Sequence, residues 1–221
     1  FRYMKVKLLM LSISLITCIS VFGQGQQAGT LSFQAGYDFG IHGTLYKSQY
    51  LGLPIETDTG GAATSMFSFG AQYNLLNWLS GGVTFVYGSY LEDTADVSAN
   101  GNNVGNISFD LRLYPVNGEK FNLYIGPEVG YSFLEIRKLN PSLGNIEEVS
   151  NYSGGHFGVN LGFNWYLFSF AGVFAQAEYT RNDFTLKQYY IDGETFDLTN
   201  WDASLNTFSG AVRVGLCFKI N

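Results

Sequence analysis

Residues 121–133 read FNLYIGPEVGYSF, and apolar side chains recur there at every second position. Successive side chains of a β-strand point to opposite faces, so this period predicts a strand that is apolar on one face only. The apolar face carries Phe121, Leu123, Ile125, Val129, Tyr131 and Phe133. The other face carries Asn122, Tyr124, Gly126, Glu128, Gly130 and Ser132. Such a strand separates two different environments.

Seven other segments repeat this alternation, and each is long enough to cross a membrane. A tilted transmembrane strand needs about 9–11 residues. The expected strands cover residues 30–40, 65–74, 79–90, 105–114, 121–134, 154–166, 171–182 and 207–220. We therefore predict an all-β protein, an eight-stranded antiparallel up-and-down transmembrane β-barrel.

The expected connections between these strands alternate in length. The short ones fall at about residues 74–79, 115–120 and 167–171, and the long polar ones at 41–64, 91–104, 135–153 and 183–206. Bacterial outer-membrane barrels have short periplasmic turns and long extracellular loops. We therefore expect an integral protein of the bacterial outer membrane, with both mature termini periplasmic and the long loops extracellular.

Composition indicates which face of each strand points outward. The polar face is rich in Gly, Ser and Asn, which fit the narrow interior of a small barrel, whereas the bulky apolar face suits lipid. Aromatic residues recur near the expected strand ends, as in the girdles at membrane interfaces. They are Tyr73, Trp78, Phe121, Trp165, Phe168 and Phe218 at the periplasmic side, and Tyr87, Tyr131 and Tyr179 nearer the other. The alternative is a soluble β-sandwich, which would bury the apolar face.

Overall composition excludes other classes of protein. Aromatic residues make up 17% of the chain and charged residues only 14%, against about 25% charged in a typical soluble domain. The mean hydropathy of +0.05 is too low for a bundle of membrane-spanning helices. The formal net charge of −6 disfavours nucleic acid as a partner, because phosphate contacts need Lys and Arg.

The first residues of the chain form a separate unit. Basic residues precede an apolar stretch from Leu8 to Phe22 that is too short and too interrupted by Ser and Thr for a membrane helix. The pattern predicts a secretory signal peptide over residues 1–23, cleaved after Gly23. Residues 24–221 would then form the barrel domain. The residues before Cys18 are close to a bacterial lipobox, so lipidation of Cys18 is the alternative to its removal.

Three features together resemble a known family. They are the leader ending at Gly23-Gln24, the Gly- and aromatic-rich strands, and the terminal sequence GLCFKIN at residues 215–221. On these features the chain resembles the Bacteroidetes-type outer-membrane β-barrel domain, similar in architecture to small OmpA/OmpX-type barrels. The resemblance covers about residues 24–221 and implies the fold rather than an activity. One departure is that assembly signals in such barrels usually end on an aromatic residue, whereas more residues follow Phe218.

Charged residues on the polar face are the most informative candidate site. The predicted lumen network comprises Asp38, Asp110, Arg112, Glu128, Glu178 and Arg213. Asp38, Glu128, Glu178 and Arg213 lie at similar heights in their strands, so we expect them to meet near mid-barrel, with Arg213 reaching Asp38 or Glu178. Buried charges are costly unless paired, which predicts a salt-bridged plug that blocks conduction. A proton or ion path is the alternative.

The acids outnumber the bases at this level of the barrel. Three carboxylates face a single guanidinium, that of Arg213. We therefore predict either that one carboxylate has a raised pKa or that Arg112 or water compensates.

Enzymatic chemistry is not expected. Lipid A deacylase barrels use a His with a Ser two residues further along the chain. Here the residue two positions after His156 is Gly158, and the one two positions after His42 is Thr44. Two histidines without converging carboxylates make no convincing zinc site. We therefore predict no catalytic, cofactor-binding or metal-binding residues. The long connections are acidic and could collect divalent cations, since carboxylate oxygens suit Ca²⁺, but solvated loop charge is the simpler interpretation.

The leading functional hypothesis is a non-enzymatic integral outer-membrane protein that acts through its extracellular loops in surface interaction or envelope integrity. One alternative is transport of small hydrophobic molecules, as in OmpW-like barrels. Another is an accessory subunit of a secretion or assembly machine, as in PorT-like barrels. The expected partners are outer-membrane lipid, lipopolysaccharide and, during biogenesis, the barrel-assembly machinery.

Overall fold

The computed structural model describes residues 25–53, 55–92, 101–140, 144 and 146–220. The signal peptide predicted over residues 1–23, and with it the alternative at Cys18, lies outside these residues. No helix in the described part of the chain has the length and hydropathy needed to span a membrane.

The described residues form a single antiparallel sheet of nine strands. Because their sequences alternate with period two, each strand presents one face to the inside and one to the outside. The strands are β1 (Leu31–Tyr50), β2 (Glu56–Leu76), β3 (Leu79–Glu92), β4 (Asn103–Asn117), β5 (Phe121–Asn140), β6 (Ile146–Tyr166), β7 (Ala171–Ile191), β8 (Glu194–Thr195) and β9 (Trp201–Ile220).

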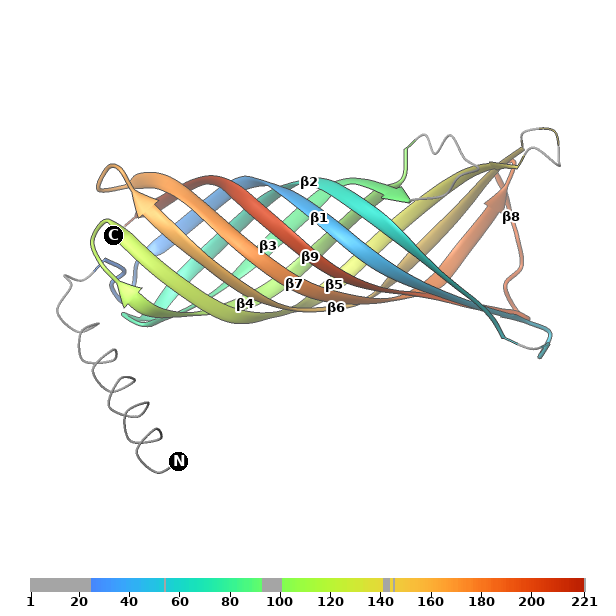
Figure 1. Ribbon diagram of the computed structural model, residues 1–221, viewed down its shortest axis with the longest axis horizontal. Helices are drawn as coiled ribbons and strands as arrows, with labels where there is room; N and C mark the ends of the chain where they lie inside the picture. The colour runs from blue at the N-terminus through green and yellow to red at the C-terminus, as the bar shows by residue number, and fades with distance from the viewer. Residues whose placement is uncertain (1–24, 54, 93–100, 141–143, 145, 221) are drawn as a thin grey trace, which may run out of the picture.

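The sheet closes on itself between its first and last strands (Figure 1). β1 pairs with β9 along their whole length, from Leu31 opposite Ile220 to Tyr50 opposite Trp201. The short strand β8 pairs only with the end of β7, so the ring itself has the eight strands that the sequence predicts. Where all eight strands run side by side, closure satisfies the backbone donors and acceptors of each strand without leaving an edge.

The two ends of the barrel differ in their connections. At one end, which we call the turn end, residues 77–78, 118–120 and 167–170 join the strands. The described chain also begins and ends there (Figure 1). At the other, which we call the hairpin end, the strands extend further before they are joined. The short connections therefore fall where the sequence predicts them.

The strands at the hairpin end are longer than predicted. The sequence predicts a loop over residues 41–64, but β1 continues to Tyr50 and pairs with β2 as far as Ser48. The expected loops at 135–153 and 183–206 are also largely strand. These loop boundaries were wrong because the strand signal came from apolar residues on the outer face. Backbone pairing continues beyond these residues, where apolar side chains no longer mark the outer face.

The middle of the barrel is inside-out relative to a soluble protein. Large apolar residues cover its exterior, with Ile41 77% exposed and Phe67 71% exposed. Charged residues occupy its interior, where Asp38 and Arg112 are each 1% exposed. The predicted assignment of the two faces is therefore confirmed, and the β-sandwich alternative, which buries the apolar face, is wrong. We call this apolar exterior the lipid belt.

Towards the hairpin end the two faces exchange character. On β7 the interior side chains change from Glu178 to Phe184, and the exterior ones change from Tyr179 to Thr185. The resulting interior cluster, which we call the apolar core, consists of Ala62, Met66, Val86, Tyr90, Val104, Leu134, Ile136, Tyr152, Phe184, Leu186, Ala203 and Leu205. The polar interior predicted for the whole barrel is therefore wrong here. Outside the lipid belt the exterior meets water, and the hydrophobic effect again drives apolar residues inward.

Candidate functional site: the filled lumen

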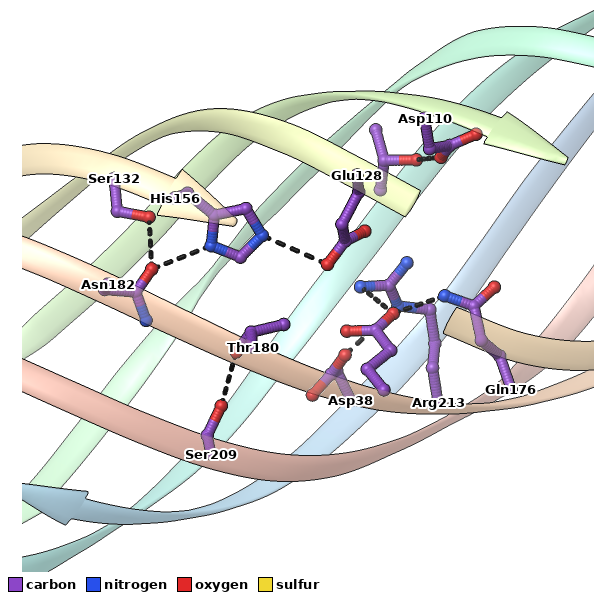
Figure 2. A network of polar contacts seen from close by, with 12 residues as sticks. Asp38, Asp110, Glu128, Ser132, His156, Gln176, Thr180, Asn182, Ser209 and Arg213 are labelled. Atoms are coloured by element: carbon purple, nitrogen blue, oxygen red, sulfur yellow. Dashed lines mark hydrogen bonds and ion pairs between the residues drawn. The ribbon is translucent and has the colours of Figure 1, made fainter. Parts of the chain in front are cut away.

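An ion-paired triad lies in the middle of the lumen. Asp38 and Arg213 face each other across the β1–β9 seam, and Arg213 Nε lies 3.1 Å from Asp38 Oδ2. The other arm of the same guanidinium, Nη2, lies 2.7 Å from Glu178 Oε1 on β7. Gln176 also donates a hydrogen bond to the Glu178 carboxylate. The structure therefore brings Arg213 to both of its predicted partners at once, and Figure 2 shows its side chain beside Asp38.

The third acid at this level, Glu128, is paired with a histidine. His156 Nε2 lies 3.1 Å from Glu128 Oε1, and its Nδ1 lies 2.7 Å from Asn182 Oδ1. Asn182 in turn accepts a hydrogen bond from Ser132 and donates one to Thr207. Figure 2 shows the imidazole between the Glu128 carboxylate and the Asn182 amide. His156 therefore belongs to the network although the sequence does not predict it.

Register explains why sequence reasoning missed His156. It lies on the polar face of β6, two residues before Gly158, which stands opposite Glu128. The pairing of β5 with β6 therefore decides the contact, and a single strand sequence does not specify that pairing.

Asp110 and Arg112 form a second charged centre nearer the turn end. Both lie on β4, with Arg112 Nε 3.4 Å from Asp110 Oδ1. Gln72 and Thr84 donate hydrogen bonds to Asp110. Arg112 donates a bond of 2.8 Å to Gln34. Its guanidinium carbon also lies 4.5 Å from the centroid of the Tyr124 ring, a cation–π contact.

Gln176 connects the two charged centres. It accepts a hydrogen bond of 2.7 Å from the Tyr124 hydroxyl and donates one to Glu178. All six predicted residues thus belong to one region of the lumen, with four carboxylates against two guanidiniums, a formal excess of two negative charges. A protonated His156 would reduce that excess to one.

The space left within the mid-barrel network is small. A cavity of about 30 Å³ is lined by Asp38, His156, Glu178 and Arg213 among others. A water molecule needs about 10–15 Å³ of such volume, so the cavity has room for about two. His42 also lines it, but its Nε2 bonds to Thr64 at 3.0 Å. Among the described residues no group of His, Cys, Asp and Glu is arranged to hold a metal ion.

A third layer closes the turn end. The segment of residues 25–30, which we call the plug segment, crosses the mouth of the barrel, and Gln26 is 0% exposed. The Gln26 side chain donates a hydrogen bond of 2.8 Å to the Tyr166 hydroxyl and accepts one of 2.8 Å from the Asn74 side chain. A Cβ atom added to Gly25 would lie only 1.7 Å from the backbone oxygen of Gly118. Glycine is therefore required for this close approach.

Sequence reasoning missed the plug segment. The alternation begins only after it, and no local signal shows that Gln26 lies inside a barrel. Its bonds to β2 and to the β6 terminus join residues far apart in the chain.

Solved structures of membrane proteins share this fold. The outer membrane protein OprG from Pseudomonas aeruginosa matches with a TM-score of 0.65 and 12% identity, over 90% of this chain and 99% of that one. The outer membrane protein AlkL, determined in DMPC lipid bilayers, matches with a TM-score of 0.56 and 10% identity, over 90% of this chain and 93% of that one. No family model and no curated protein matches the sequence.

At these identities the likeness establishes the fold alone. The predicted β-barrel architecture is confirmed, while the finer resemblance to the Bacteroidetes type stays a prediction. This chain has the fold of the small β-barrel proteins of the bacterial outer membrane.

Proposed function

We propose that this chain is a non-enzymatic, non-conducting protein of the outer membrane that acts through its hairpin end at the cell surface. The observation that carries the proposal is the filling of the lumen at successive levels, by the plug segment, the charged network and the apolar core. A pore needs a continuous polar path, and each of these layers consists of buried, mutually bonded or packed side chains.

The orientation follows from general features of outer-membrane barrels. Their short turns face the periplasm and their longer connections face outward. The turn end would therefore be periplasmic, and the hairpin end, with its apolar core and polar exterior, would stand in the aqueous medium outside. Lipid and lipopolysaccharide would surround the lipid belt.

Transport of small hydrophobic molecules finds less support. The interior towards the hairpin end is apolar, as a route for such molecules would need, but Val86 and Leu134 are each 1% exposed. The side chains of the apolar core pack against one another at this level and would stand in the way of such a route. Surface interaction through the hairpin end is therefore the better-supported role.

Planar-bilayer recording tests the sealed lumen. We expect the purified protein to give no steps of ionic current above the baseline, while a porin reconstituted in parallel gives clear current steps. A variant with Gln26, Arg112, Arg213 and Phe184 replaced by Ala should introduce conductance, because it removes large buried side chains from each of the three layers. Regular steps from the unmodified protein would overturn the proposal.

Thiol labelling of intact cells tests the orientation. Cys217 is buried, and replacing it by Ser removes the background. In that variant a new cysteine at Asp197, at the hairpin end, should react with a membrane-impermeant maleimide, whereas one at Lys120, at the turn end, should react only after the outer membrane is opened. The reverse order of reactivity would contradict the proposed orientation.

A further inference from the structure

A cavity of about 320 Å³ opens at the hairpin end of the barrel. We call it the outer cup. Its floor includes Ile136, Tyr152 and Leu205, which are members of the apolar core. The outer cup therefore ends blindly on packed side chains. Its volume lies at the lower end of the range for small-molecule sites, about 300–1,000 Å³.

Aromatic side chains form the wall of the outer cup. Tyr46, Tyr189 and Trp201 line it and pack against the apolar core. The rings of Tyr189 and Trp201 are 5.0 Å apart at an interplanar angle of 82°. Edge-to-face packing of this kind holds both rings in fixed orientations. The wall is therefore a preformed aromatic surface.

The charged residues that line the outer cup are mostly acidic. Asp58, Glu92 and Glu148 line it together with a single basic residue, Lys138. Three carboxylates against one ammonium leave a formal charge of −2. The Lys138 ammonium lies 3.3 Å from Glu92 Oε2, so its charge is already paired. An anion would meet an unfavourable potential here, and a cation a favourable one.

Glu148 is fixed beside the aromatic wall. Its Oε2 accepts a hydrogen bond of 2.8 Å from the Tyr189 hydroxyl, and its Oε1 accepts one of 2.7 Å from Asn140. Burial and this bond to Glu148 raise the pKa of Tyr189, so the hydroxyl remains a donor at neutral pH. A carboxylate is thus held in place next to the partly buried rings of the aromatic wall.

We propose that the outer cup binds a small organic cation, an ammonium group carried on an apolar body. The apolar body would rest on the floor, and the ammonium would lie against the aromatic wall within reach of the carboxylates. Cation–π attraction and charge then favour the same ligand class. The inference rests on the proposed function in one respect only, which is the side of the membrane from which the ligand reaches the outer cup.

Three matched probes test this in non-ionic detergent micelles. They are phenylpropyl-trimethylammonium, its uncharged tert-butyl isostere, and phenylpropanesulfonate, each titrated calorimetrically. We expect the cation to saturate at one per chain and to bind about tenfold more tightly than the neutral isostere, with its affinity falling as salt is added. The sulfonate should not bind. Equal affinities for cation and isostere, or no saturable binding of the cation, would overturn the proposal.

Variants locate the site. Glu148→Gln and Trp201→Leu should each weaken binding of the cation by about fivefold to tenfold. Glu194→Gln is the matched control, because Glu194 lies on β8 at the same end but does not line the outer cup. A loss of affinity in the control equal to that in Glu148→Gln would mean non-specific attraction and would overturn the site. Heat-modifiable gel migration reports folding of each variant.

Failure of this inference and failure of the proposed function give different results. Calorimetry in micelles requires neither a closed lumen nor a particular orientation in the membrane. Bilayer recording and cell labelling require no ligand. An outer cup that binds no cation in a non-conducting, correctly oriented barrel would therefore refute the inference alone.

Discussion

Asp38 and Arg213 lie directly opposite each other on β1 and β9, and their ion pair of 3.1 Å spans the seam that closes the barrel. These residues are 175 positions apart in the chain. Because the same guanidinium also binds Glu178 on β7, one side chain joins the first strand to the last two strands of the ring.

Removing this guanidinium should destabilise the barrel strongly. We expect Arg213→Ala to lower the free energy of unfolding by about 3–5 kcal/mol, because Asp38 and Glu178 would remain buried without their partner. Urea unfolding in micelles, followed by gel migration, measures the change. The control is Arg181→Ala, since Arg181 pairs with Asp183 at 2.8 Å on the exposed surface and should contribute at most about 1 kcal/mol. Similar losses in both variants would contradict the importance of the seam.

His156 should contribute more to the free energy of unfolding than His42 does. His156→Leu leaves both Glu128 and Asn182 without a bond from the ring, which predicts a loss of about 1–3 kcal/mol. Within the described part of the chain, the ring of His42 makes a hydrogen bond to Thr64 alone, and its Nδ1 has no hydrogen-bond partner. We therefore expect His42→Leu to cost less than His156→Leu in the same unfolding assay. The opposite ranking would show that the Glu128–His156 contact adds little.

Glycine at position 25 should hold the plug segment in place. A Cβ at this position would collide with the Gly118 backbone, so Gly25→Ala should release residues 25–30 while the strands stay folded. Amide hydrogen exchange should then rise at Gln26 and Gly29, whose N–H groups bond to Asn117 and Asn74. At Gly43 no atom of a described residue lies within 4 Å of the added Cβ, so Gly43→Ala should leave exchange unchanged. Unaltered exchange in Gly25→Ala would refute this role.

A charged side chain on the outer face should lower the free energy of unfolding only where it lies within the lipid belt. Val214 faces outward opposite Tyr37, and Val214→Arg should lower the free energy of unfolding in lipid by about 2–4 kcal/mol. Thr185→Arg places the same charge outward on β7, beyond the belt, and should change stability by about 0.5 kcal/mol or less. Equal effects at the two positions would mean that no lipid boundary lies between them.

The sequence was informative where one face of a strand met lipid. The alternation around Phe121 and Val129 predicted β5, and the same pattern predicted the other strands of the ring. Beyond the lipid belt the pattern fails, because residues such as Ile136 point inward and Arg137 outward, as in a soluble protein. A single alternation rule therefore cannot describe both halves of the same strand.

The candidate site was predictable to the extent that it depended on strand polarity. Charged residues on the polar face had to lie inside, which is where Asp38 and Glu178 are found. Which of them touch depends on register between strands and on side-chain reach, so the Glu128–His156 contact required the structure. The plug segment also required it, because a segment without alternation gives no indication of where it lies.

A spin-label scan along β7, from residue 173 to residue 187, tests the inverted barrel most directly. Outward positions 175, 177 and 179 should be accessible to oxygen dissolved in lipid, and outward positions 185 and 187 to a water-soluble nickel reagent. Inward positions such as 176 and 178 should be accessible to neither. Nickel accessibility at 175–179 equal to that at 185 would place the lipid belt in water and would contradict the membrane assignment.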